Sequence, residues 1–392
     1  MARTKPTLRL ALFGALLTAV IAAGAACASG GEKLPPVVPA GTAPSKLPRP
    51  LALSRGRVFF VARHGNDAGP GTRARPWRTI QHALERLGPG QRVLVRRGTY
   101  VQDLVAERSG TARAPITVAA YPRERVVLRA ASTSGDTYPL RITSGAAYLR
   151  VQGFVIELAK GTSSTNVYFE GRAHHVELSS NEIRFSQDQG IFSEASTSNL
   201  QLLGNRIHDN GRGHVSGQHQ SHGIYIEGRN HLIANNLVNR HPFGFGIQVY
   251  PENTGTIVVN NTVVHSGHSG IVVGGDEGVG NITIRNNILA FNASYGVAAD
   301  SACPIAPVLV DTNILYGNRD GGVEKSCNTI NSGSGNIGAD PRFVSRSGGN
   351  MLLRSGSPAI DRARGDYSPR VDIRGRRRPL GAGYDVGAFE RG

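Results

Sequence analysis

Short runs in which apolar and polar residues alternate recur along the chain between residues 174 and 330. Examples are VELSSNEI, HGIYIEG, GIQVYP and TIVVNNTVV, all rich in Val and Ile. An alternation with a period of two predicts β-strands that turn every second side chain into a core. Because no long stretch in this region has helical periodicity, we expect an all-β architecture.

The strands belong to a repeat of about 25 residues. Each repeat begins with the pattern apolar–x–x–Asn–x–apolar, where x is any residue. A Gly with apolar residues after it follows further along the repeat. This pattern occurs six times, at Asn181/Gly190, Asn205/Gly223, Asn236/Gly246, Asn261/Gly270, Asn287/Gly296 and Asn313/Gly322. A single repeat cannot bury its own apolar face, so we expect coils that stack at the strand spacing of about 4.8 Å. Asparagines at a fixed place in each coil are typical of a structural ladder.

Two of the three cysteines occupy related places in this repeat. Cys303 lies seven residues after Gly296, and Cys327 lies five residues after Gly322. Their positions on adjacent coils predict a disulfide, which leaves Cys27 unpaired.

The N-terminus has the layout of a secretory signal peptide. Arg3, Lys5 and Arg9 precede an apolar stretch over residues 10–26. We predict a signal peptide over residues 1–28 and a proline-rich linker over residues 29–50. Cleavage at an ordinary site and lipidation of Cys27 are the two alternatives. Both predict export, either as a secreted protein or at the cell surface, with the membrane reached only through such an anchor.

Composition narrows the class of partner. The 392 residues include 50 glycines and carry a formal net charge of +16, of which +13 remains without residues 1–26. The composition excludes a coiled coil, a collagen, a multi-span membrane protein and a disulfide-dense small domain. Excess positive charge suits an acidic polymer, and export favours an acidic polysaccharide over nucleic acid. We expect a monomer.

The sequence resembles the pectin-lyase-like, right-handed parallel β-helix superfamily. The resemblance rests on the repeat, on VFFVARHGNDAGPGTRARPWRTIQHALERLGPG near the start, and on RSGSPAIDRARGDYSPRVDIRG near the end. It implies a single-stranded right-handed parallel β-helix over residues 51–392. The expected parts are an N-terminal cap with a helix near residues 76–87 (57–122), coils (123–330) and a closing tail of the choice-of-anchor Q type (331–392). The superfamily includes lyases, hydrolases, epimerases and adhesins, so the fold alone does not identify the reaction.

The third coil is irregular and marks a candidate site. Eighteen residues separate Asn205 from Gly223, where the other coils have nine or ten, and the extra residues form a loop over residues 210–221. Positions two and four after each Gly are expected to face outward. They bring Tyr225, Gln248, Glu194, Glu227 and Tyr250 to one surface.

These residues suit cleavage of a uronate polymer by β-elimination, which needs a base, an acid and a group that neutralises the carboxylate. His219, His222 and Tyr225 are candidates for base and acid. Arg240 or Arg212 is the candidate cation. Glu194, Glu227, Gln248 and Tyr250 would contact substrate. The same set could epimerise C5.

Other readings stay open. Glu194 and Glu227 share a column and could be the carboxylate pair of a retaining glycosidase, or could hold Ca²⁺. The protein could also bind glycan without catalysis. Many pectate-lyase relatives hold Ca²⁺ with stacked aspartates, which are not in register here, and we find no zinc or nucleotide motif. We therefore expect no cofactor and no metal, with Ca²⁺ as the alternative.

Overall fold

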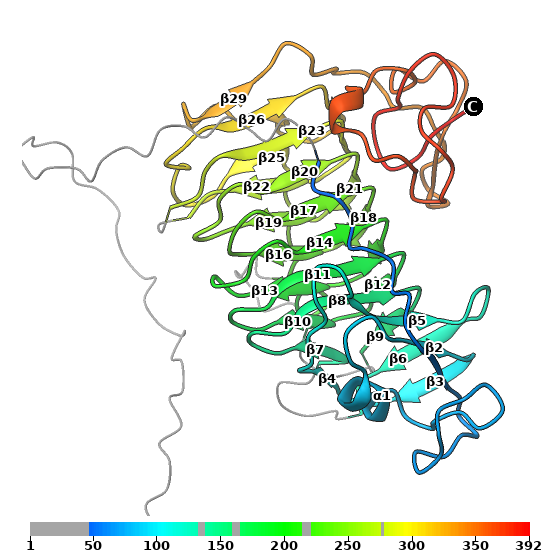
Figure 1. Cartoon of the computed structure of the whole chain (residues 1–392). Helices are drawn as coiled ribbons and strands as arrows, with labels where there is room; N and C mark the ends of the chain where they lie inside the picture. The colour runs from blue at the N-terminus through cyan, green and yellow to red at the C-terminus, as the bar shows by residue number, and fades with distance from the viewer. Residues whose placement is uncertain (1–46, 132–137, 159–164, 214–220, 276–277) are drawn as a thin grey trace, which may run out of the picture. The chain divides into compact units, whose positions relative to one another are not determined.

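A computed structural model describes residues 47–131, 138–158, 165–213, 221–275 and 278–392. The predicted signal peptide, Cys27 and most of the predicted linker lie outside the described residues. Three parallel sheets dominate the structure, and their strands follow one another in rotation along the chain (Figure 1).

The strands of sheet A are β1 (Val58–Val61), β2 (Arg92–Val95), β5 (Ile116–Ala120), β8 (Ala147–Gln152), β11 (His174–Ser179), β14 (Gln201–Leu203), β17 (Leu232–Ala234), β20 (Ile257–Val259), β23 (Ile282–Arg285), β26 (Val308–Asp311) and β29 (Ile330–Ser332). Those of sheet B are β3 (Gly98–Val101), β6 (Val126–Arg129), β9 (Val155–Glu157), β12 (Glu182–Arg184), β15 (Arg206–His208), β18 (Leu237–His241), β21 (Thr262–Ser266), β24 (Ile288–Ala290) and β27 (Ile314–Tyr316). Those of sheet C are β4 (Leu104–Ala106), β7 (Leu140–Ile142), β10 (Val167–Phe169), β13 (Ile191–Ser193), β16 (Ile224–Ile226), β19 (Ile247–Val249), β22 (Ile271–Val273), β25 (Tyr295–Ala299) and β28 (Gly321–Val323).

Each coil contributes one strand to each sheet. In one coil β11, β12 and β13 follow in sequence, and each pairs in parallel with its equivalent in the next coil, β14, β15 and β16. This arrangement confirms the predicted parallel β-helix.

The asparagine ladder lies at the turn between sheets A and B. Asn236 is fully buried; its Oδ1 accepts the Asn205 backbone N–H at 2.9 Å, and its Nδ2 donates to Leu202 O at 2.8 Å. The same pattern links the six asparagines of the repeat and extends to Asn336. The ladder therefore satisfies buried backbone groups at a corner where strand pairing stops.

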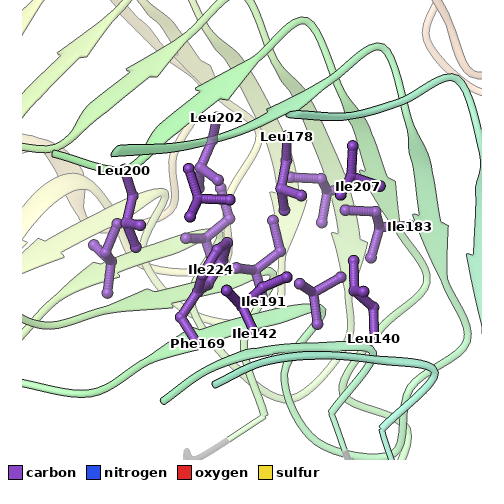
Figure 2. Close-up of a cluster of buried hydrophobic side chains, with 14 of the residues drawn as sticks. Leu140, Ile142, Phe169, Leu178, Ile183, Ile191, Leu200, Leu202, Ile207 and Ile224 are labelled. Atoms are coloured by element: carbon purple, nitrogen blue, oxygen red, sulfur yellow. The ribbon is translucent and has the colours of Figure 1, made fainter. Parts of the chain in front are cut away.

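The core is a column of aliphatic side chains from all three sheets. Leu178, Ile183 and Ile191 come from the three strands of one coil, and Figure 2 shows them facing the same interior. All three side chains are fully buried. Stacking coils supply the apolar contacts that a single coil lacks.

The N-terminal end of this core is covered by α1 (Ile80–Arg86). Its N-cap is Thr79, whose side chain accepts the His82 N–H, and Asp67 in turn accepts the Thr79 hydroxyl at 2.8 Å. Ile80 and Leu84 pack into the core. The predicted capping helix is present, starting a few residues later than the proline that we expected to open it.

The segment before β1 lies along sheet A and is not a free tether. Arg150 and Glu177 form a buried ion pair at 2.7 Å, and this pair also binds the backbone of Leu51. Further along, Gln201 donates to Arg49 O at 2.9 Å and Leu47 packs beside β17 and β20. The boundary predicted at residue 50 therefore falls inside a bound segment.

The C-terminal residues pack against the sides of the sheets. The hairpin of β30 (Phe343–Ser345) and β31 (Asn350–Leu353) joins a cluster with Leu237, Val264 and Ile288 of sheet B. The short 3₁₀ helix η1 (Gly365–Tyr367) brings Tyr367 against sheet A. We expected a tail that closes the solenoid; instead, this tail covers apolar side chains that point outward from the last coils.

Near the last coils Cys303 and Cys327 form a disulfide, with Cα atoms 5.5 Å apart. Among the described residues, no helix is both long and apolar enough to cross a membrane.

Candidate functional site

The outer face of sheet C carries a continuous column of side chains in register. Arg141, Tyr168, Phe192, Tyr225 and Gln248 lie on five consecutive strands at paired positions. The repeat predicted this column from Phe192 onward. It missed Arg141 and Tyr168, because their coils precede the first recognisable Asn–Gly pair and the register could not be counted there.

The aromatic members of the column stack on one another. Ring centroids are 4.6 Å apart between Tyr138 and Tyr168, 5.4 Å between Tyr168 and Phe192, and 5.0 Å between Phe192 and Tyr225, with interplanar angles of 15° or less. Both faces of Tyr168 and Phe192 are thus covered by neighbouring rings. A sugar ring can meet the edges of these two rings and the Tyr168 hydroxyl but cannot lie flat on either ring.

A second column of outward side chains lies two residues further along the chain in each coil, and most of its members are acidic. Glu194 donates its backbone N–H to Phe169 O, and Glu227 donates its own to Ser193 O. These bonds put Glu194 and Glu227 at the same place in neighbouring coils, as the repeat predicted. Glu170 precedes them, and Tyr250 and Asp300 occupy the place in later coils.

The two central carboxylates have different surroundings. Glu194 accepts hydrogen bonds from the Tyr168 hydroxyl and from the Gly171 backbone N–H. Burial raises the pKa of Glu227 to about 7, and the charges of Glu194 and Glu252 add to this rise. A hydrogen bond from the Tyr225 hydroxyl works in the opposite direction but is outweighed. Glu227 is therefore a carboxyl group that exchanges its proton near neutral pH.

Tyr225 and His222 pack together. Burial, followed by the charge of Glu227, raises the pKa of Tyr225. The phenol therefore keeps its proton and donates a hydrogen bond to Glu227. His222 is 2% exposed, stacks between Tyr225 and Phe245, and accepts the Phe245 backbone N–H on Nδ1 at 3.1 Å. Nδ1 therefore carries no proton. A catalytic role for either residue stays a prediction, and His219 lies outside the described residues.

Gln248 has the outward register position that we expected, but its side chain is covered by the protein and is not open to solvent. It is 6% exposed, and its Nε2 donates to Asp300 at 2.8 Å. Phe245 packs over Val272 and Ala298, the next members of the column. Tyr250 lies beside Tyr225 with ring centroids 6.1 Å apart. The open part of the surface thus ends near Tyr225 and Tyr250.

The two predicted cations come together, but at a different place. Arg240 lies on β18 of sheet B, where its guanidinium binds the Asp209 carboxylate at 2.6 Å. Arg212 donates to the backbone carbonyl of Asp209 at 3.0 Å. Burial alone would raise the pKa of Asp209, but hydrogen bonds from Arg240 and His208 lower it to about 2. On sheet C the column itself supplies a cation, Arg141, which pairs with Glu170 at 2.9 Å.

The carboxylates of the acidic column accept hydrogen bonds from the protein itself: Glu170 from Arg141, Glu194 from Tyr168 and Gly171, and Glu227 from Tyr225. The expectation of no metal, with Ca²⁺ as the alternative, stays a prediction. Within the part of the chain that the structure describes, no three His, Cys, Asp or Glu side chains gather in a way that could hold a metal ion.

Comparison with known proteins supports the β-helix fold. The family model "Pel9A-like, right handed beta helix region" matches residues 59–219, and the model "Right handed beta helix region" matches residues 166–337. The crystal structure of pectate lyase Pel9A superposes with a TM-score of 0.65 at 17% identity, covering 87% of this chain and 98% of that one. XylC in complex with xylose has a TM-score of 0.55 at 14% identity, over 71% of this chain and 68% of that one.

These matches support the pectin-lyase-like, right-handed parallel β-helix superfamily, and the backbone of this chain follows that of pectate lyase Pel9A. The uncharacterized protein YwoF of Bacillus subtilis (strain 168) is 30% identical over 135 residues. That match spans 33% of this chain and 29% of YwoF, so the chain covers less than a third of that relative.

Proposed function

We propose that this protein is an exported, polysaccharide-active enzyme that works by general acid–base catalysis on the outer face of sheet C. Glycoside hydrolysis is the reaction that the geometry supports best. One observation carries this proposal: Glu194 and Glu227 are neighbours in one column, and burial raises the pKa of Glu227 to about 7.

Two carboxyl groups with different proton affinities are what a glycosidase needs. In this scheme Glu227 donates a proton to the glycosidic oxygen. Glu194, held by Tyr168 and Gly171, acts on the anomeric carbon as the ionised partner. Adjacent strands place the two backbones about 4.8 Å apart, which is close to the carboxyl separation of about 5 Å in retaining enzymes.

The second candidate is β-elimination of a uronate polymer, together with the related epimerisation of the uronate at C5. The position of Arg141 favours this candidate. A lyase must neutralise the substrate carboxylate, and Arg141 is a half-exposed cation on the same column as Tyr225. In that reaction Glu227 would protonate the leaving oxygen. The acidic groups near Glu227 and Tyr225, which include Glu194 and Glu252 near the former and Asp300 near the latter, work against an anionic sugar at this point and favour the hydrolase.

Export is part of the proposal. It is supported by the signal-like sequence over residues 1–28 and by the Cys303–Cys327 disulfide, which persists in an oxidising compartment. Polysaccharides outside the cytoplasm are then the available substrates.

The test is a panel of neutral and uronate polysaccharides assayed in parallel for new reducing ends and for the ultraviolet absorbance of an unsaturated uronate. Hydrolysis gives reducing ends without absorbance, and Glu227→Gln should lower kcat by about 10²–10⁴-fold. Glu107→Gln is the matched control, because Glu107 follows β4 at the equivalent place in the first coil and is exposed.

Absorbance that is lost in Glu227→Gln and Arg141→Gln would replace the hydrolase by a lyase at the same site. A product of inverted C5 configuration without cleavage would identify an epimerase. Binding with no reaction on any polymer, unchanged in Glu227→Gln, would leave a non-catalytic glycan-binding protein.

A further inference from the structure

A pocket lies where the C-terminal hairpin meets the corner of sheet B. Its volume is about 470 Å³, and its lining includes Phe291, Phe343, Asp340, Arg342, Arg346 and Arg354. Phe291 directly follows β24. The three arginines flank the strands of the hairpin: Arg342 precedes β30, Arg346 lies in the turn after it, and Arg354 follows β31. Two parts of the chain that are distant in sequence thus form one pocket.

The pocket is strongly basic. Arg342, Arg346 and Arg354 are all exposed, and among the described residues none of them has a carboxylate within ion-pair distance. The carboxylate of the lining, Asp340, accepts the backbone N–H of Arg342 at 2.8 Å. Three guanidinium groups that share a concave surface repel one another, and an anion between them would remove that repulsion.

Contacts with the protein hold two of the arginines in place. Arg354 donates to Val344 O at 2.6 Å, which fixes its guanidinium beside β30. The Arg346 guanidinium lies 4.3 Å from the ring centroid of Phe291. Their orientation is therefore partly set before any ligand arrives, which lowers the entropic cost of binding.

The pocket adjoins a row of three residues along the corner of sheet B. Arg240, His265 and Phe291 follow one another at equivalent places in three coils, each in a left-handed conformation with φ of 57°, 55° and 59°. The His265 ring stacks on Phe291 with centroids 5.9 Å apart. Burial lowers the pKa of His265, and the charges of Arg346 and Arg240 lower it further. Both arginines therefore act on the same imidazole.

We propose that this pocket is a second glycan-binding site, which takes an acidic sugar chain through its carboxylate or sulfate groups. Arginine suits this ligand because its planar fork binds an oxyanion through two parallel hydrogen bonds. The volume indicates more than a bare ion, because a water-sized group needs only about 30 Å³. The site is separate from sheet C and does not depend on the reaction proposed there.

Isothermal titration calorimetry of the full chain tests the proposal. The probes are a hexamer of galacturonate, a neutral xylohexaose, and sodium sulfate at matched ionic strength. The variant Arg342→Gln/Arg346→Gln/Arg354→Gln removes the three charges from exposed positions, so the fold should be retained. The control Arg55→Gln/Arg78→Gln/Arg113→Gln removes three other exposed arginines and the same net charge.

The galacturonate hexamer should bind the parent chain and the control alike, and should bind the pocket variant about tenfold or more weakly, as expected for lost charge-assisted hydrogen bonds. Equal affinity in the pocket variant and the parent would overturn the proposal. Equal binding of xylohexaose would overturn the role of the anion. Sulfate that binds as tightly as the hexamer would show a site for free anions and would overturn the assignment to a sugar chain.

Discussion

At the scale of single residues, Glu227 is the most unusual group of the site. A carboxyl with a raised pKa holds its proton more tightly in the folded chain than in the unfolded chain. The unfolded carboxyl releases its proton near pH 4.5, and the folded one near pH 7. The contribution of this residue to stability is thus unchanged below about pH 4.5, falls as the pH rises from 4.5 to 7, and is constant above that range.

Glu227→Gln should therefore stabilise the protein at pH 8 and have little effect at pH 4. The amide keeps the shape and the hydrogen bond with Tyr225 without a charge to desolvate. We expect a gain on the order of 2 kcal/mol at pH 8, read as a rise in Tm across a series of buffers. Glu107→Gln, at the exposed equivalent position, should give a flat profile. A Tm difference for Glu227→Gln that is the same at both pH values would show that its carboxyl is not perturbed.

At the scale of elements, the repeat predicted what recurs and missed what occurs once. Asn181 to Asn313 and their glycines set the register of the coils, because each coil must satisfy the same corner in the same way. The column with Tyr225 and the pair Glu194/Glu227 follow directly from that register. The burial of Gln248 does not follow from it. Gln248 binds Asp300 two coils further along, and Phe245, in the loop between sheets B and C where the repeat has no fixed pattern, packs over the neighbouring Val272 and Ala298.

Asn236→Ala tests how much the ladder contributes. It leaves the Asn205 N–H and the Leu202 carbonyl without their partners in a fully buried corner. We expect a loss of about 2–4 kcal/mol in thermal or urea unfolding, since each buried orphan costs about 1–3 kcal/mol. Asn336→Ala is the control: it removes the last rung, which is partly exposed, so that water can replace the amide. Equal losses in the two variants would mean that burial does not determine the cost.

At the scale of the whole molecule, the features that the sequence did not predict are contacts between segments that are distant along the chain. Arg150 and Glu177 look like two charges on separate coils, yet they form a buried pair that binds the backbone of Leu51, about a hundred residues away. Likewise Leu237, Val264 and Ile288 point outward and would be exposed without the tail. No local pattern in the sequence predicts this packing. The segment around Leu51 and the C-terminal tail do not repeat, and each contacts its partner strands once.

The tail should therefore stabilise the last coils of sheet B. Leu353→Ala removes a side chain that is 5% exposed from the cluster between the hairpin and the sheet, and a buried Leu→Ala change costs about 2–5 kcal/mol. Val344→Ala is the control, because Val344 lies in the same hairpin but is 38% exposed.

Hydrogen exchange measures which strands the Leu353→Ala change destabilises. Faster exchange in Leu353→Ala should be confined to the hairpin and to β18, β21, β24 and β27, which carry the covered side chains. The strands β3, β6 and β9 should keep their protection, because coils of a solenoid contact only their neighbours. Faster exchange along the whole solenoid would instead show that the coils unfold as one unit and that the tail stabilises all of them.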